Sequence, residues 1–208
     1  MEFNKVLYTN HIPLGIDEKL LLTRLSYKKS KTEASPELFD EIKRISDIAL
    51  GISKPWAAYT FLHLDHDADN LLSFENFFIN SKQLSTKMSD CHAAALMAVT
   101  LGNAVDEKIS ELIGKDEYTC AVVLDAATSC IADSAVKELR QHINKVLTDD
   151  NLRLSKFRLS PGQLDMPFSM QKLIYDKLSL DKIGLSINDK MALTPQKSII
   201  SLTGILKI

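Results

Sequence analysis

The sequence predicts one globular domain that combines helices with strands, and three observations support this. Apolar residues recur at helical spacing after Asp17 and after Ser35, and aspartate and serine are favoured helix N-caps. The range 116–147 contains no proline or glycine, which indicates one helix of about thirty residues. The range 92–102 is almost entirely apolar, which is typical of a strand buried on both faces.

The other elements follow from turn residues and hydrophobic spacing. Pro36 at a first helical position predicts a helix that continues to Gly51. In chain order, strands are expected at 56–64 and 71–79, a short helix at 81–88, a helix after Gly102, a helix from Pro167 to Leu178, and closing strands at 183–187 and 198–206.

Composition limits the functions that the chain can have. Its 208 residues are 45% hydrophobic and 25% charged, with 25 Lys and Arg against 27 Asp and Glu. A net charge of −2 favours neither nucleic acid nor an anionic membrane as a partner. The start of the chain lacks a signal-peptide pattern and no apolar run reaches about 18 residues, so we expect a cytoplasmic protein. Three cysteines without a CxxC pair predict free thiols.

The acidic segment 63–70 is the candidate metal site of the sequence. Aspartates alternate at positions 65, 67 and 69, as at the start of a calcium-binding loop. However, Asn70 stands where the loop needs glycine, and Asn76 stands where it needs a bidentate glutamate. We therefore interpret the segment as a solvated hairpin tip and predict no metal site.

The segment 157–167 is the strongest candidate for ligand binding. Pro161 removes a backbone donor, and Gly162 permits positive φ and a close approach of a ligand to the main chain. A guanidinium at Arg158 could form a forked pair with a carboxylate or phosphate. The alternative is a surface turn with a solvated arginine, because Pro-Gly turns are common.

The long predicted helix has a polar stripe with a four-residue repeat. The stripe contains Asp125, Ser129, Asp133 and Lys137. Such a stripe is usually the solvated face of an amphipathic helix. Asp133 could instead accept hydrogen bonds from the hydroxyl or ammonium groups of a ligand, if the arginine turn folds back beside it.

Taken together, several segments resemble the activation (reactivation) domain of cobalamin-dependent methionine synthase, and in particular its short stand-alone forms. The similarity spans nearly the whole chain and depends on the order of its pieces. They are 98–102, 124–126, 158–162 with Asp165 and Pro167, 183–184, and 195–198.

The resemblance implies an α+β fold with a twisted antiparallel sheet flanked by helices. It implies a helical arm at 1–53 that packs on a core at 54–208. Such a domain holds S-adenosylmethionine over the cobalamin of a partner methionine synthase or corrinoid protein. A flavodoxin-type donor reduces cob(II)alamin, and S-adenosylmethionine then methylates the product. The task of the domain is positioning, without a catalytic residue of its own.

The resemblance also implies which residues contact the ligand. The expected contacts are Asp133, Arg158, Ser160, Pro161, Gly162 and Gln163, with Asp125, Ser129 and Asp165 as further candidates. This chain departs from the family pattern at Gln163, where tyrosine is common, and at Leu152, where longer members carry an acidic residue. The sequence also ends at Ile208, before the position of another family tyrosine.

Two functions of different classes are compatible with this pattern. The first is a subunit that binds S-adenosylmethionine and supports reductive methylation of cobalamin on a partner in trans. The alternative is a docking module that recognises a corrinoid protein and has lost S-adenosylmethionine binding. In either case the chain is expected to be a component of a methyltransferase system that does not act alone.

Overall fold

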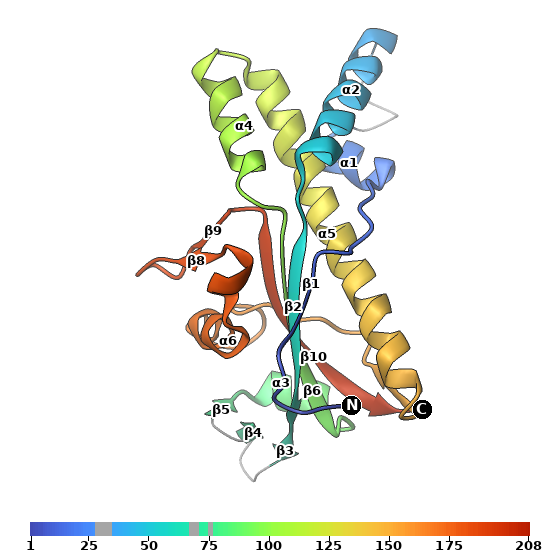
Figure 1. Cartoon of the computed structure of the whole chain (residues 1–208), viewed down its shortest axis with the longest axis vertical. Helices are drawn as coiled ribbons and strands as arrows, with labels where there is room; N and C mark the ends of the chain where they lie inside the picture. Colours follow the sequence, from blue (N-terminus) through green and yellow to red (C-terminus); the bar gives the residue numbers. More distant parts are fainter. Residues whose placement is uncertain (28–34, 67–70, 75–76) are drawn as a thin grey trace.

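The computed structural model describes residues 1–27, 35–66, 71–74 and 77–208. The fold belongs to the α+β class and is built on a curled, five-stranded antiparallel sheet flanked by helices (Figure 1). The strand order is β1-β2-β6-β10-β7. The strands are β1 (Leu7–Thr9), β2 (Trp56–His63), β6 (Ala93–Thr100), β7 (Leu152–Leu154) and β10 (Ser198–Lys207).

Strand β6 forms the centre of this sheet. It pairs with β2 from Trp56↔Thr100 to His63↔Ala93, and with β10 from Ser198↔Thr100 to Ile205↔Ala93. Every residue of β6 is buried, as predicted from the apolar range 92–102. Because side chains alternate along a strand, the sheet contributes to two hydrophobic cores, one on each face.

The long helix α5 (Tyr118–Thr148) packs on the first face. It is accompanied by α1 (Glu18–Arg24), α2 (Pro36–Ile52) and α4 (Ala104–Gly114), and all three contact it. By length and composition alone α5 could cross a membrane, but 61% of its most apolar window is buried inside the structure. This burial is typical of the core helix of a globular domain.

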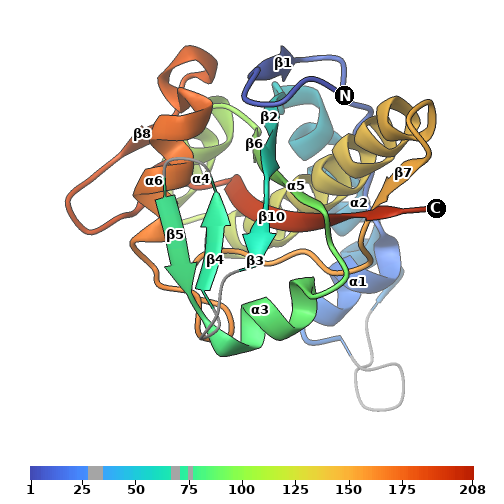
Figure 2. The same cartoon turned by 90° about the horizontal axis from the view of Figure 1, so that it is seen from below.

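Smaller elements cover the opposite face (Figure 2). They are α3 (Lys82–Met88), α6 (Met170–Leu178), the 3-10 helix η2 (Leu180–Ile183), a sheet of β3 (Asp65–His66), β4 (Leu71–Phe74) and β5 (Phe77–Asn80), and the pair β8 (Ser186–Ile187) and β9 (Leu193–Thr194). This face therefore has shorter elements and more connecting segments than the α5 face.

Side-chain caps fix the start of three helices, and the sequence predicted two of these caps. The Asp17 carboxylate accepts from the amides of Lys19 and Leu20, and Ser35 accepts from Leu38. Ser81 caps α3 in the same way. Each cap satisfies a backbone donor that has no partner within its own helix.

Three element boundaries differ from the prediction. Helix α6 begins at Met170 and not at Pro167, because the amides of residues 170–172 bond three residues back and form turns before the helix. The strand expected at 71–79 divides into β4 and β5, and the strand expected at 183–187 is partly the 3-10 helix. Of the segment 63–70, which was interpreted as a hairpin tip, residues 67–70 lie outside the described residues.

Candidate ligand-binding site

Arg158 lies where the chain rejoins the edge of the main sheet after β7. Leu159 and Leu202 exchange two backbone hydrogen bonds of 2.9 and 2.8 Å, which extend the edge beyond β7. Between β7 and this bridge the chain bulges. Arg140 from α5 fixes the bulge by donating to the Ser155 carbonyl at 2.6 Å and to the Thr203 hydroxyl at 3.2 Å. The sequence analysis did not identify Arg140.

The side chain of Arg158 points to the α5 face and approaches Asp133. Leu159 packs in the core on the α6 side, so alternation along the extended segment places Arg158 on the other side. Its Nη2 lies 3.9 Å from Asp133 Oδ1. Its Nη1 is buried and has no hydrogen-bond partner among the described residues. The guanidinium and the carboxylate therefore converge to ion-pair distance, but 3.9 Å is too long for a hydrogen bond and Nη1 has no partner among the described residues.

Positive charge exceeds negative charge around Arg158. Burial, and then the charge of Arg158, lower the pKa of Arg140. Arg140 bonds carbonyl and hydroxyl oxygens in this region, which do not neutralise its charge. Asp133 is also bonded by Arg24 from α1, with Nη2 at 2.7 Å from Oδ2. Two guanidiniums, those of Arg24 and Arg158, thus face the Asp133 carboxylate, and the charge of Arg140 acts on Arg158. This excess of positive charge favours an anionic ligand group.

Internal hydrogen bonds close the predicted Pro-Gly turn. Gly162 adopts φ of +86°, which only glycine reaches without strain, and its amide donates to the Met166 carbonyl at 3.1 Å. The Gln163 side chain accepts from the Ser160 amide at 2.8 Å. Pro161 is buried within the turn. Gln163, which stands where the family commonly has tyrosine, therefore supports the turn that carries Arg158.

Asp165 connects this turn to α3. Its carboxylate accepts from the Ser81 hydroxyl and from the Gln83 amide, the latter at 3.1 Å. These two hydrogen bonds, the Ser81 bond first, lower the pKa of Asp165 below its usual range. The carboxylate is therefore committed to the N-terminus of α3 and holds the turn against it.

The remaining acidic part of the α5 stripe has a partner of its own. Lys197 Nζ bonds Asp125 at 2.7 Å and Ser129 at 2.9 Å. The Lys197 side chain is only 12% exposed. The polar stripe thus faces cations from other elements along its length, with Lys197 at one end and Arg158 with Arg24 at the other.

A groove of about 360 Å³ lies beside the turn. Its lining residues are Ser160, Gln171, Leu193, Gln196, Ser198, Ile199 and Ile200. Leu202 directs its peptide groups to Leu159, so alternation in an antiparallel ladder directs the peptide groups of Ile200 to the same edge. At Ile200, β10 pairs with β6 on one side, and on the opposite edge no strand of the described residues pairs with it. The floor of the groove therefore presents one peptide donor and one peptide acceptor side by side.

A second buried polar atom lies on the same edge. The Leu159↔Leu202 bridge places Ser160 opposite Ser201. Ser201 is 1% exposed, and its hydroxyl has no partner within the described ranges. It and Arg158 Nη1 are the two such atoms in the described part of the chain. Buried polar groups usually have partners, so both atoms indicate a position for water or ligand.

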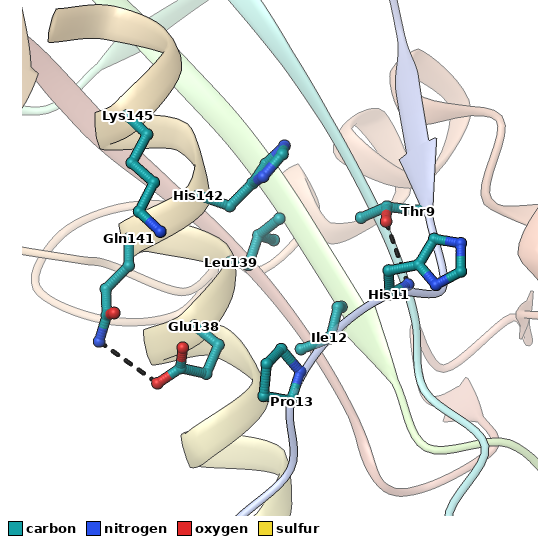
Figure 3. Close-up of a pocket in the computed structure, with 9 residues that line it drawn as sticks. All are labelled: Thr9, His11, Ile12, Pro13, Glu138, Leu139, Gln141, His142 and Lys145. Carbon is teal, nitrogen blue, oxygen red and sulfur yellow. Dashed lines mark hydrogen bonds between the residues drawn. The ribbon is translucent and has the colours of Figure 1, made fainter.

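A separate hollow of about 180 Å³ lies between the end of β1 and the C-terminal half of α5 (Figure 3). His142 lies in it and its Nε2 is 3.3 Å from the Tyr59 hydroxyl. Most of its polar side chains, including His11, His142 and Lys145, are exposed to solvent. The hollow shares no lining residue with the groove beside the turn, so we place the candidate site at the turn.

The described residues contain no obvious nucleophile or metal ligand set. Burial, and then the charge of Asp90, raise the pKa of Cys91 to about 11, which keeps its thiol protonated at neutral pH. No group of three or more His, Cys, Asp or Glu side chains in the described ranges is arranged to hold a metal ion. The candidate site consists of binding groups: guanidiniums, a carboxylate and peptide groups.

Comparison with solved structures identifies the fold. The chain is similar to the MetH reactivation domain in a crystal structure bound to AdoHcy, with a TM-score of 0.70 and 14% sequence identity. The match covers 96% of this chain and 78% of that chain. No family model matches the sequence, and no curated protein matches it. The class of fold is therefore that of the methionine synthase reactivation domain, as the resemblance implied.

Proposed function

We propose that this chain binds S-adenosylmethionine and supports reductive methylation of cobalamin on a corrinoid partner in trans. The observation that carries the proposal is the buried Nη1 of Arg158, which has no hydrogen-bond partner among the described residues, while Nη2 of the same guanidinium lies 3.9 Å from Asp133 Oδ1. A guanidinium with a free edge is suited to a carboxylate, and S-adenosylmethionine carries one. The fold supports the proposal, because its solved neighbour was crystallised with AdoHcy.

Different residues of the site would bind different parts of the ligand. Arg158 would bind the carboxylate, and Asp133 would accept from the ammonium group. Ser160, Pro161, Gly162 and the peptide groups of Ile200 would line the adenosyl part, since the groove begins at Ser160. Adenine presents a donor beside an acceptor, which matches the peptide pair on the floor of the groove. The residues present therefore fit this ligand.

The chemistry would come from the bound molecules. S-adenosylmethionine supplies the methyl group, and the partner supplies cobalamin together with an electron from a flavodoxin-type donor. This chain would hold the sulfonium in one orientation and contribute proximity, consistent with a site composed of binding groups.

Calorimetric titration with S-adenosylmethionine and AdoHcy tests the proposal. We expect saturable heat for the wild-type chain and its loss in Arg158→Ala. Arg153→Ala is the matched control, because Arg153 is an exposed arginine on the neighbouring strand β7. Absence of heat at saturating ligand would refute binding. A methyl-transfer assay with a corrinoid methyltransferase that lacks this domain then tests the role in trans.

A surface feature supports the alternative, a docking module for a corrinoid protein. Large apolar side chains are exposed near the ends of α2, α4 and α5. They are Leu38, Phe39, Ile113, Tyr118 and Val122, with Val122 61% exposed. Clustered apolar exposure of this kind marks protein interaction surfaces. The alternative predicts that Val122→Glu weakens capture of the corrinoid protein although the chain does not bind S-adenosylmethionine.

A further inference from the structure

Arg24 is a component of the candidate site that neither its sequence position nor the resemblance indicated. It is the last residue of α1 and lies 109 positions before Asp133. Its Nη2 is 2.7 Å from Asp133 Oδ2, whereas Arg158 Nη2 is 3.9 Å from Oδ1. The shorter contact to the candidate carboxylate is therefore made by the N-terminal helix and not by the turn.

The backbone that carries Arg24 is fixed on the α5 face. Asp17 caps the start of α1, and Leu21 is only 3% exposed in the core that α5 shares. The amide of Leu25, just after the helix, bonds back to the Leu21 carbonyl at 2.9 Å. The helix thus delivers a guanidinium to Asp133 from a defined position.

The Arg24–Asp133 pair is accessible enough to be exchanged. The side chains of Arg24 and Asp133 are 38% and 36% exposed. Ion pairs at this level of exposure contribute little to stability, because solvent screens them. A ligand ammonium could therefore replace the guanidinium at Asp133 Oδ2, at the cost of breaking this pair.

We propose that Arg24 is a built-in competitor that occupies the place of the ligand ammonium at Asp133. The inference rests on the proposed function, because it takes an amino acid ligand as given. In the free chain Arg24 would neutralise Asp133. On binding, the ammonium would displace Arg24, so the affinity for amino acid ligands is reduced by the strength of the displaced pair. Arg24 would thereby determine specificity through Asp133.

Two ligands and two variants test the competition. AdoHcy contains the ammonium group, and its deaminated analogue lacks that group alone. We expect Arg24→Gln to tighten AdoHcy binding by roughly two- to fivefold, the upper part of the range expected for loss of a competing exposed ion pair. The deaminated analogue should bind both proteins equally within about twofold by the same reasoning. Arg44→Gln is the control, because Arg44 pairs with Glu41 within α2.

Each outcome supports or overturns the proposal. Tighter binding of AdoHcy alone supports it, including a case in which only the Arg24→Gln protein shows measurable binding. Weaker or unchanged binding of AdoHcy, or equal tightening of both ligands, overturns it. If AdoHcy binds the wild type and Arg158→Ala abolishes that binding while Arg24→Gln has no effect, the proposed function stands and the competitor role fails. If no protein binds either ligand, both fail.

Discussion

The two ends of the α5 polar stripe differ in how completely their charges are paired. At one end Lys197 is nearly buried and bonds Asp125 and Ser129 at 2.7 and 2.9 Å. At the other end two guanidiniums face Asp133, one of them at 3.9 Å and with a buried nitrogen that has no partner in the described part of the chain. At the Lys197 end the cation has hydrogen-bond partners, so this contact is structural. At the Asp133 end a buried guanidinium nitrogen lacks a partner among the described residues, as expected for a group that binds a ligand.

Replacement of Arg158, at the Asp133 end of the stripe, should have the largest effect on ligand affinity. Arg158→Ala removes the free guanidinium edge, and a charged hydrogen bond to a carboxylate typically contributes about 1.5–3 kcal/mol, or roughly 10- to 150-fold in affinity. Arg158→Lys should recover only part of this loss, since an ammonium cannot form the forked pair. Calorimetry with AdoHcy measures both variants. Retention of wild-type affinity in Arg158→Ala would show that the unpartnered guanidinium does not bind the ligand and that the two ends of the stripe do not differ in this respect.

Replacement of Lys197 should have the opposite profile. Lys197→Met keeps the aliphatic packing but leaves Asp125 and Ser129 without their cation, so we expect a loss of about 1 kcal/mol in the free energy of unfolding. Ligand affinity should change little, because the contact is complete without a ligand. Urea denaturation measures the first effect and calorimetry the second. A large loss of affinity with unchanged stability would show that both ends bind the ligand.

The Asp165 carboxylate should contribute to stability in a pH-dependent way. Its hydrogen bonds lower its pKa from the usual 3.8, so the folded state favours the ionised form. The contribution is fully present above 3.8 and is lost as pH falls through the lower folded pKa. Asp165→Asn should reduce the urea midpoint at neutral pH and flatten the acid limb of the stability curve. An unchanged acid limb would show that the contact with α3 contributes nothing.

The smallest expected effect is that of Gln163→Tyr. A tyrosine at this position could pack against a ligand ring, which contributes about 0.5–1.5 kcal/mol in aromatic pairs. The change also removes the bond from the Ser160 amide to Gln163. We therefore expect a net gain in AdoHcy affinity of only a few fold, measured by calorimetry beside the wild type. Weaker binding would show that the turn depends on Gln163 more than the ligand depends on an aromatic contact.

Local patterns predicted most of the fold. The caps at Asp17 and Ser35, the buried strand around β6 and the long helix α5 each follow from residues within a few positions of one another. Helix α6 was predicted to begin too early, because Pro167 is compatible both with a first helical turn and with the irregular turns that precede Met170. The resemblance implied an antiparallel sheet, but the strand order was not predicted, because the paired strands lie far apart in the chain.

The site was only partly predictable for a physical reason. Asp133 belongs to a stripe that helical periodicity reveals, and Arg158 lies beside a turn that proline and glycine reveal. Arg24 meets Asp133 across 109 positions, and an arginine in the last turn of a short helix has the pattern of an ordinary solvated residue. Arg140 was likewise hidden, because its role depends on the carbonyl groups of a bulge.

The most direct test of ligand binding by Arg158 compares the affinities of the wild-type chain for AdoHcy and for its decarboxylated analogue. If the free edge of Arg158 receives the ligand carboxylate, calorimetry should show binding of AdoHcy and roughly 10- to 150-fold weaker binding of the analogue, because the analogue keeps every other group. Equal affinities for the two ligands would contradict the assignment of this guanidinium to the carboxylate.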